Sequence, residues 1–166
     1  VSGVEIKTFE DLKEALNIRL DYFADHGCSV SDHALEYVMY APATAEEIEV
    51  IFAKRLNKED ITKEEELKFK TAFMQFVAKQ YHKRNWVMQI HYGCRRDNNT
   101  PYYKRLGPDT GYDCINNYAP SAQTADFLNS LIASNELPKT ILYSLNPNDN
   151  EAIGTILGCF QGTEAA

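Results

Sequence analysis

The feature that most constrains the fold is a short apolar run, Trp86–Ile90, which follows a long helical pattern and leads directly into His91. Strand-forming residues that lie between a helical pattern and polar turn residues predict a buried strand. In sheets whose strands alternate with helices, ligands bind beyond the carboxyl ends of the strands, because the loops there converge on one crevice. His91 and the nearby Arg95 and Arg96 are therefore candidates for a functional site.

Two other segments are predicted to be strands. Lys139–Leu145 is apolar and β-branched, as a fully buried parallel strand should be, and Cys28–His33 is a shorter and only partly apolar candidate. Helical patterns separate the three segments, which favours parallel strands joined by helical crossovers. Three strands cannot close a barrel, so both edges of such a sheet would be open, as is typical of a piece of a larger domain.

Capping boxes predict where three helices begin, at Thr8–Asp11, Thr44–Glu47 and Thr62–Glu65. The first helix is expected to run to about His26, with Gly27 as its cap. The helix that begins at Thr62 is expected to dock on the sheet through a stripe of apolar residues at helical spacing. That stripe consists of Phe69, Phe73, Phe76 and Val77.

The second half of the chain contains a long segment, residues 95–117, without clear periodicity. Such segments are often functional, so Asp109 and Asp113 either lie near a bound ligand or only form turns. A helix is predicted from Ser121 to about Asn135, and a last one after residues 146–149, with Gly162 as its end.

Length, charge and cysteine content exclude several classes of protein. A chain of 166 residues fits one domain, and a net charge of −7 does not fit nucleic-acid binding or attachment to anionic membranes. No apolar run approaches the roughly 20 residues of a membrane span. The four cysteines form no C-x-x-C pair, so reduced thiols are expected. We therefore expect a cytoplasmic protein.

The predicted strand ends carry the residues with chemical potential. Asp32 or His33, then His91, then Asn146 would lie along one rim of the sheet. A histidine with a carboxylate can bind a divalent metal or act as acid and base, although structural hydrogen bonding by either residue remains an alternative. The paired arginines offer the bidentate fork that matches a carboxylate or phosphate, and one of them could be a plain surface residue. Spacing alone suggests a small anionic substrate.

At this level of detail the sequence resembles the middle part of bacterial uronate isomerases. The resemblance extends over nearly the whole chain and rests on motifs that occur in the same order. They are Val30–Leu35, Gln89–Asn99, Leu106–Asp113, Leu137–Glu151 and Cys159–Gly162. Small departures are Asp97, where asparagine is common, and Asn148, where a basic residue is common.

The resemblance implies an α/β fold that forms part of a (β/α)8 TIM barrel of the amidohydrolase superfamily, with three parallel strands and flanking helices. Residues 1–166 would be a single internal segment of a larger metal-dependent barrel domain, about its fourth to sixth strand units. Members of the family hold most of their metal ligands on a His-x-His pair and a later aspartate, and neither is found in these residues. We therefore expect the isolated chain to be inactive and to form homo-oligomers through its exposed strand edges.

The function implied for the complete enzyme is the interconversion of D-glucuronate and D-fructuronate, or of D-galacturonate and D-tagaturonate, by proton transfer between C2 and C1. By similarity, Asp32, His91 and Arg96 are catalytic, Arg95 and Arg96 bind the sugar acid, and His91 is a possible ligand of a divalent metal such as zinc. The sequence leaves open a hydride shift, a hydrolase of the same superfamily, and a non-catalytic α/β module that binds a sugar acid or a protein partner.

Overall fold

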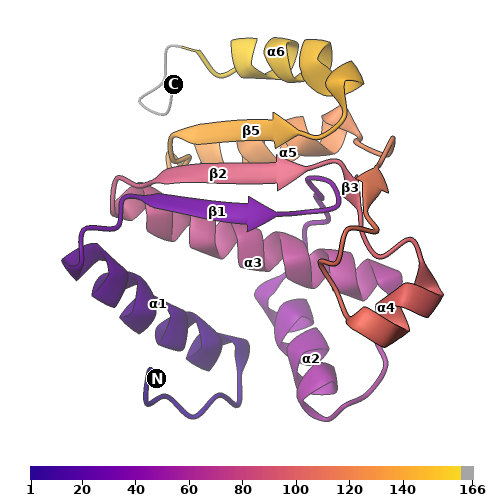
Figure 1. Ribbon diagram of the computed structural model, residues 1–166. Helices are drawn as coiled ribbons and strands as arrows, with labels where there is room; N and C mark the ends of the chain where they lie inside the picture. Colours follow the sequence, from indigo (N-terminus) through magenta and orange to yellow (C-terminus); the bar gives the residue numbers. More distant parts are fainter. Residues whose placement is uncertain (162–166) are drawn as a thin grey trace.

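Three parallel strands form the centre of the protein, which is described here for residues 1–161 from a computed structural model (Figure 1). β1 (Val30–Ala34) pairs with β2 (Val87–Tyr92), and β2 pairs with β5 (Thr140–Ser144), so that the order is β1-β2-β5. The predicted α/β fold with three parallel strands and flanking helices is confirmed. Among the described residues, β1 and β5 are the two edges of this sheet.

Helices separate the strands along the chain, and α3 lies against the sheet on one side (Figure 1). The most deeply buried side chains belong to β2, α3 and α5, including Met88, Ile90, Ala78, Phe127 and Leu131. No helix within residues 1–161 has both the length and the apolar character needed to cross a bilayer. The longer helices are α1 (Phe9–Asp25), α2 (Ala45–Leu56), α3 (Lys63–Lys83), α5 (Ser121–Ile132) and α6 (Asn150–Gly158), and a 3-10 turn, η1 (Pro147–Asp149), precedes α6.

The two faces of the sheet have different environments. Successive side chains of a strand point to opposite faces, and in β2 the side chains of Met88, Ile90 and Tyr92 are buried while that of His91 is exposed. The register places His91 beside Ala34 of β1 and Tyr143 of β5. The face that carries His91 is therefore open, and its exposed side chains include Val30, Asp32, Ile141 and Tyr143.

Helix starts follow the predicted capping boxes. In α1, α2 and α3 the side chain of the N-cap threonine accepts from the backbone N–H three residues later, and the carboxylate there accepts from the N-cap N–H. Gly27 follows α1 with φ +84°, a left-handed conformation that glycine adopts without steric cost. The expected ends of the later helices need correction, since α5 ends at Ile132 and not near Asn135. α6 ends at Gly158, and Gly162 lies outside the described residues.

The expectation that the phenylalanine stripe of α3 docks on the sheet is only partly right. The ring centroid of Phe69 lies 5.3 Å from that of Phe9 in α1 and 5.9 Å from that of Phe52 in α2. These three rings belong to a second, smaller core. A helix of 21 residues is about 31 Å long, whereas a strand of five residues spans about 17 Å. The amino-terminal half of α3 therefore extends beyond the sheet, and its later residues, including Val77, contact the strands.

Acid should destabilise the protein through these capping carboxylates. Backbone N–H donors lower the pKa of Asp11 and Glu47, and Lys54 together with the Thr62 N–H lowers that of Glu65. A carboxyl whose pKa is lower in the folded state stabilises the fold above its unfolded pKa and loses that effect as the pH falls through the folded value. We expect these carboxylates to lower the melting temperature below the ordinary glutamate pKa of about 4.3, in addition to a fall below about pH 6.5 from His33, whose pKa is lowered by burial.

The measurement is thermal unfolding by circular dichroism between pH 3 and pH 7. The control is the double variant Glu47→Gln/Glu65→Gln, which keeps two capping boxes because glutamine also serves at that position but removes the titrating groups. Its melting temperature should fall less between pH 5 and pH 3 than that of the unmodified protein. Equal losses in both proteins would contradict the assignment.

Candidate active site

The segment after β2 is more ordered than the sequence indicates. β3 (Cys94–Arg95) pairs in antiparallel register with β4 (Cys114–Ile115), and α4 (Thr100–Leu106) lies between them. The expectation of a segment without regular structure was therefore wrong, because two-residue strands and a seven-residue helix are too short to produce a visible period. In Figure 1 this segment lies beyond the arrowheads of the parallel strands, at their carboxyl ends.

His91 is the centre of a side-chain cluster on the open face. Its Nδ1 lies 2.6 Å from Oδ1 of Asp32 on β1, and its ring stacks on that of Tyr143 with centroids 4.3 Å apart and an interplanar angle of 5°. The stacking follows from the register, because paired residues of neighbouring strands point to the same face about 4.8 Å apart. A carboxylate can only accept, so Nδ1 donates to Asp32, and Nε2 is the nitrogen that can accept a proton or bind a metal.

The side chains of two other predicted rim residues do not join this cluster. His33 points to the covered face, where its Nε2 lies 2.9 Å from the hydroxyl of Tyr81, and burial lowers the pKa of its imidazole. Asn146 is buried, and its side-chain oxygen accepts from the Asn148 N–H at the start of η1. Of the alternatives Asp32 and His33, only Asp32 therefore joins His91, as strand alternation requires.

The two arginines have different surroundings. Nη1 of Arg96 donates to Oδ1 of Asp109 and to Oδ2 of Asp113, both at 2.9 Å. The side chain of Arg95 is exposed and makes no hydrogen bond or ion pair within the part of the chain that the structure describes. Its role in substrate binding stays a prediction.

A cavity of about 230 Å³ lies at the carboxyl ends of the three strands, and both His91 and Arg96 line it. Burial raises the pKa of the Cys94 thiol, which also lines the cavity, so this thiol is protonated and uncharged near neutral pH. Neither Tyr143 nor Cys94 was identified from the sequence, because only strand register and the β3–β4 pairing bring them here. The lining residues are Ala34, Leu35, His91, Tyr92, Cys94, Arg96, Tyr143, Ser144 and Leu145.

Gly93 allows the chain to turn from β2 into β3 beside this cavity. Its φ is +85°, and a Cβ built on it would lie 3.0 Å from Oγ of Ser144 and 3.2 Å from the backbone nitrogen of Leu145. Gly93→Ala should therefore destabilise the protein by about 1–3 kcal/mol. The matched control is Gly154→Ala in α6, where a Cβ meets nothing within 4 Å and helix propensity favours alanine. Thermal unfolding should separate the two, and equal melting temperatures would refute the expected strain.

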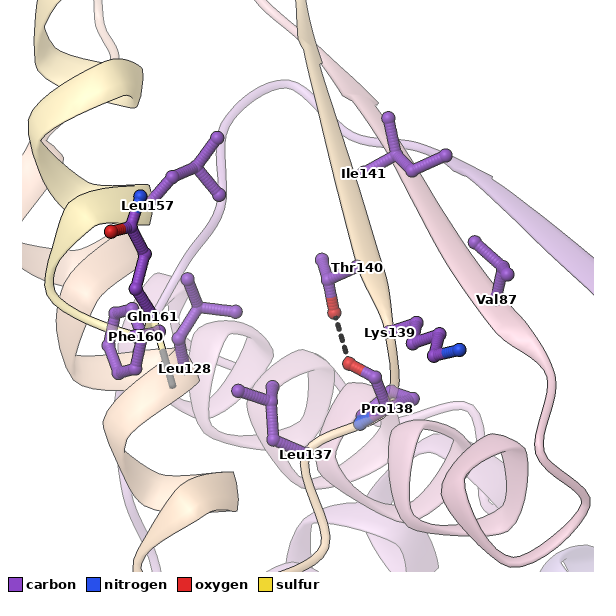
Figure 2. Close-up of a pocket in the computed structure, with 10 residues that line it drawn as sticks. All are labelled: Val87, Leu128, Leu137, Pro138, Lys139, Thr140, Ile141, Leu157, Phe160 and Gln161. Carbon is purple, nitrogen blue, oxygen red and sulfur yellow. Dashed lines mark hydrogen bonds between the residues drawn. The ribbon is translucent and has the colours of Figure 1, made fainter. Parts of the chain in front are cut away.

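A second cavity lies at the opposite ends of the strands and has a different character. It has a volume of about 380 Å³ and is bounded by the start of β5, α5 and the residues around the end of α6 (Figure 2). The side chains around it are mostly apolar, among them Leu128, Leu137 and Phe160. It contains no acid–base pair, so it is the weaker candidate for chemistry.

Metal binding can be tested against the donor groups. Among residues 1–161, no group of three or more histidine, cysteine, aspartate or glutamate side chains is arranged to hold a metal ion. His91 supplies one possible imidazole ligand. The described residues therefore do not fit a complete metal centre.

Parallel strands with helical crossovers, and a histidine, a carboxylate and an arginine at their carboxyl ends, are typical of α/β enzymes. A profile of the glucuronate isomerase family matches residues 1–166. The chain is 64% identical over 165 residues to a uronate isomerase of Lachnospira eligens and 61% identical to one of Lachnoclostridium phytofermentans. The chain belongs to the glucuronate isomerase family.

Solved structures support the same conclusion. The chain matches uronate isomerase from Thermotoga maritima with a TM-score of 0.89 and 30% identity, covering 96% of this chain and 35% of that one. It matches glucuronate isomerase from Caulobacter crescentus with a TM-score of 0.78 and 28% identity, covering 89% of this chain and 30% of that one. The matches to the two sequence relatives above likewise include 99% of this chain but only 35% of the length of each relative.

Proposed function

We propose that the complete enzyme containing this chain interconverts D-glucuronate and D-fructuronate, or D-galacturonate and D-tagaturonate. The observation that carries the proposal is the joint lining of one cavity by His91 and Arg96, with Asp32 bonded to the histidine. A sugar acid has a carboxylate at one end and the reacting carbons at the other. The cavity therefore offers one group for each end: a guanidinium for the carboxylate and an acid–base histidine for the reacting carbons.

In this proposal, the reaction begins when a base removes the proton from C2 of the open-chain aldose while the carbonyl oxygen on C1 gains a proton. The resulting enediol then loses the proton of its C2 hydroxyl and receives a proton on C1, which gives the ketose without a net change in protons. Nε2 of His91 is suited to accept and return a proton, because Asp32 holds Nδ1 as the donor. Arg96, with Arg95 as the second candidate, would hold the carboxylate away from the reacting carbons.

We also propose that residues 1–166 form one internal segment, about the fourth to sixth strand units, of a larger metal-dependent (β/α)8 barrel domain. The open face of the sheet and its two edges support this proposal. A divalent metal, zinc or a similar ion, is expected in the complete enzyme, with its other ligands outside this chain. His91 is the one possible ligand within it, and this is an alternative to its role as proton carrier because Nε2 cannot serve both. Cytoplasmic location stays a prediction from the sequence.

The proposed activity is tested by assaying D-glucuronate and D-galacturonate with added divalent metal, using this chain and the complete reading frame that encodes it. We expect turnover by a protein that includes the missing barrel strands and none by residues 1–166 alone. Absence of turnover of either uronate by a complete, folded protein would overturn the proposed function. Turnover by residues 1–166 alone would overturn the proposal that essential groups lie outside them.

Association through the strand edges is a separate proposal. β1 and β5 each have one side without a partner strand among the described residues, and Val30 and Ile141 are exposed on the open face. Exposed edges and apolar faces favour self-association. Sedimentation of residues 1–166 should show oligomers, and a strictly monomeric species would contradict the proposal.

A further inference from the structure

Two carboxylates hold Arg96 through a single nitrogen. A guanidinium has five N–H donors, of which Nη1 carries two. Nη1 of Arg96 lies 2.9 Å from Oδ1 of Asp109 and 2.9 Å from Oδ2 of Asp113, so each of its protons has an acceptor. Nε and Nη2 have no hydrogen-bond partner among residues 1–161.

The donors left over form the edge of the guanidinium that suits a carboxylate. The N–H groups of Nε and Nη2 are parallel and match the two oxygens of a carboxylate in a bidentate pair. Arg96 lines the cavity that His91 also lines, whereas Asp109 and Asp113 are not among its lining residues. The aspartates therefore hold the guanidinium without occupying the cavity.

Asp113 and Asp109 differ in how firmly they are placed. The second oxygen of Asp113 accepts from the backbone N–H of Asp97 at 2.9 Å, so one carboxylate binds both Arg96 and the residue that follows it. The Asp113 side chain is 25% exposed and that of Asp109 is 78% exposed. The Asp97 N–H, together with Arg96, also lowers the pKa of Asp113, so this group is ionised at neutral pH.

The backbone around this contact is fixed from both sides. The backbone N–H of Asn98 donates to the carbonyl of Tyr112 at 2.9 Å, and its side-chain amide donates to the carbonyls of Arg95 and Tyr112. The chain before α4 is thereby tied to the residue that precedes Asp113. Asp113 therefore follows a residue that is held by hydrogen bonds from Asn98, whereas Asp109 lies on the exposed stretch between α4 and β4.

We propose that Asp113 is a positioning residue: by anchoring Nη1 of Arg96, it keeps the Nε and Nη2 edge available for the carboxylate of a sugar acid. Asp109 contributes less, because its side chain is exposed and has no contact with the Asp97 backbone. The inference rests on the proposed function, in which Arg96 binds the substrate carboxylate. It adds a role for Asp113, which does not itself touch the substrate.

The test compares Asp113→Asn with Asp109→Asn in the complete reading frame. In Asp113→Asn, the amide can still accept from the Asp97 N–H but then turns its own donor toward Arg96. We expect the KM for D-glucuronate to rise about tenfold or more with kcat changed less than about threefold, because the carboxylate is bound alike in the ground and transition states. For Asp109→Asn we expect less than about a threefold change in KM, since exposed ion pairs contribute little.

A neutral substrate separates positioning from general damage to the fold. D-glucuronamide has no charged carboxylate. Its KM with Asp113→Asn should therefore stay within about twofold of its KM with the unmodified enzyme. If that variant does not fold, Asp113→Glu is measured instead, which keeps a carboxylate but moves it, and the same selective rise in KM is expected. Melting temperatures of all variants are recorded alongside.

The outcomes distinguish this inference from the proposed function. An unmodified enzyme that neither binds nor turns over a uronate would overturn both. An active enzyme in which Asp113→Asn leaves the KM for D-glucuronate unchanged, or raises it equally for the amide, would overturn the role of Asp113 alone.

Discussion

Replacing Arg96 by methionine in the complete enzyme is expected to raise the KM for D-glucuronate by a factor of about 100 or more. Each hydrogen bond to a charged group contributes about 1.5–3 kcal/mol, and a bidentate pair contains two. Methionine keeps an unbranched side chain at the rim of the cavity but removes every donor. Because the carboxylate lies away from the reacting carbons, kcat should fall less than KM rises. Steady-state kinetics with D-glucuronate measure both constants.

Arg95→Met provides the comparison for the second predicted arginine. Arg95 is exposed, does not line the cavity and makes no side-chain hydrogen bond or ion pair among the described residues, so we expect less than about a threefold change in KM. A large effect at Arg95 and a small one at Arg96 would mean that the substrate carboxylate binds outside the cavity described here.

The second large effect is expected at His91. His91→Gln should lower kcat by a factor of about 1,000, within the range that general acid–base catalysis supplies, and should leave KM nearly unchanged. Glutamine retains a hydrogen-bonding group but cannot accept and return a proton near neutral pH. Asp32→Asn should also lower kcat, because its amide no longer favours the tautomer with a proton on Nδ1.

His33→Gln is the matched control on the neighbouring strand. Its imidazole contacts Tyr81 on the covered face, so its loss should lower the melting temperature and leave kcat within about threefold. Equal loss of kcat in the two histidine variants would indicate that His91 acts through the stability of the sheet. That result would mean that His91 is not a catalytic group.

The elements with strong local signals could be predicted from the sequence. Thr8, Thr44 and Thr62 each begin a helix, because capping needs only residues three positions apart. The runs at Trp86 and Lys139 form parallel strands, because apolar and β-branched residues favour strands. The expectation that the second of them is fully buried was wrong, since Ile141 and Tyr143 are exposed on the open face. The family itself could be identified from motifs that span most of the chain.

The geometry of the site needed information that is not local. Asp32 and His33 are adjacent, and only the register with β2 shows which of them meets His91. The contact between Arg96 and Asp113 likewise depends on β3 and β4, whose two residues each leave no periodic signal. Residue types at the strand ends could thus be nominated from the sequence, whereas their partners required the paired strands.

The order of the strands in the sheet has a consequence for how the protein is made. β1, β2 and β5 lie side by side in the order in which they occur along the chain, so no later strand must insert between two earlier ones. During synthesis, which proceeds from the amino terminus, β2 can pair with β1 before β5 has left the ribosome, and β5 then adds at the free edge of β2. Each crossover helix emerges before the strand that it delivers. The sheet can therefore grow in one direction, at the pace of translation.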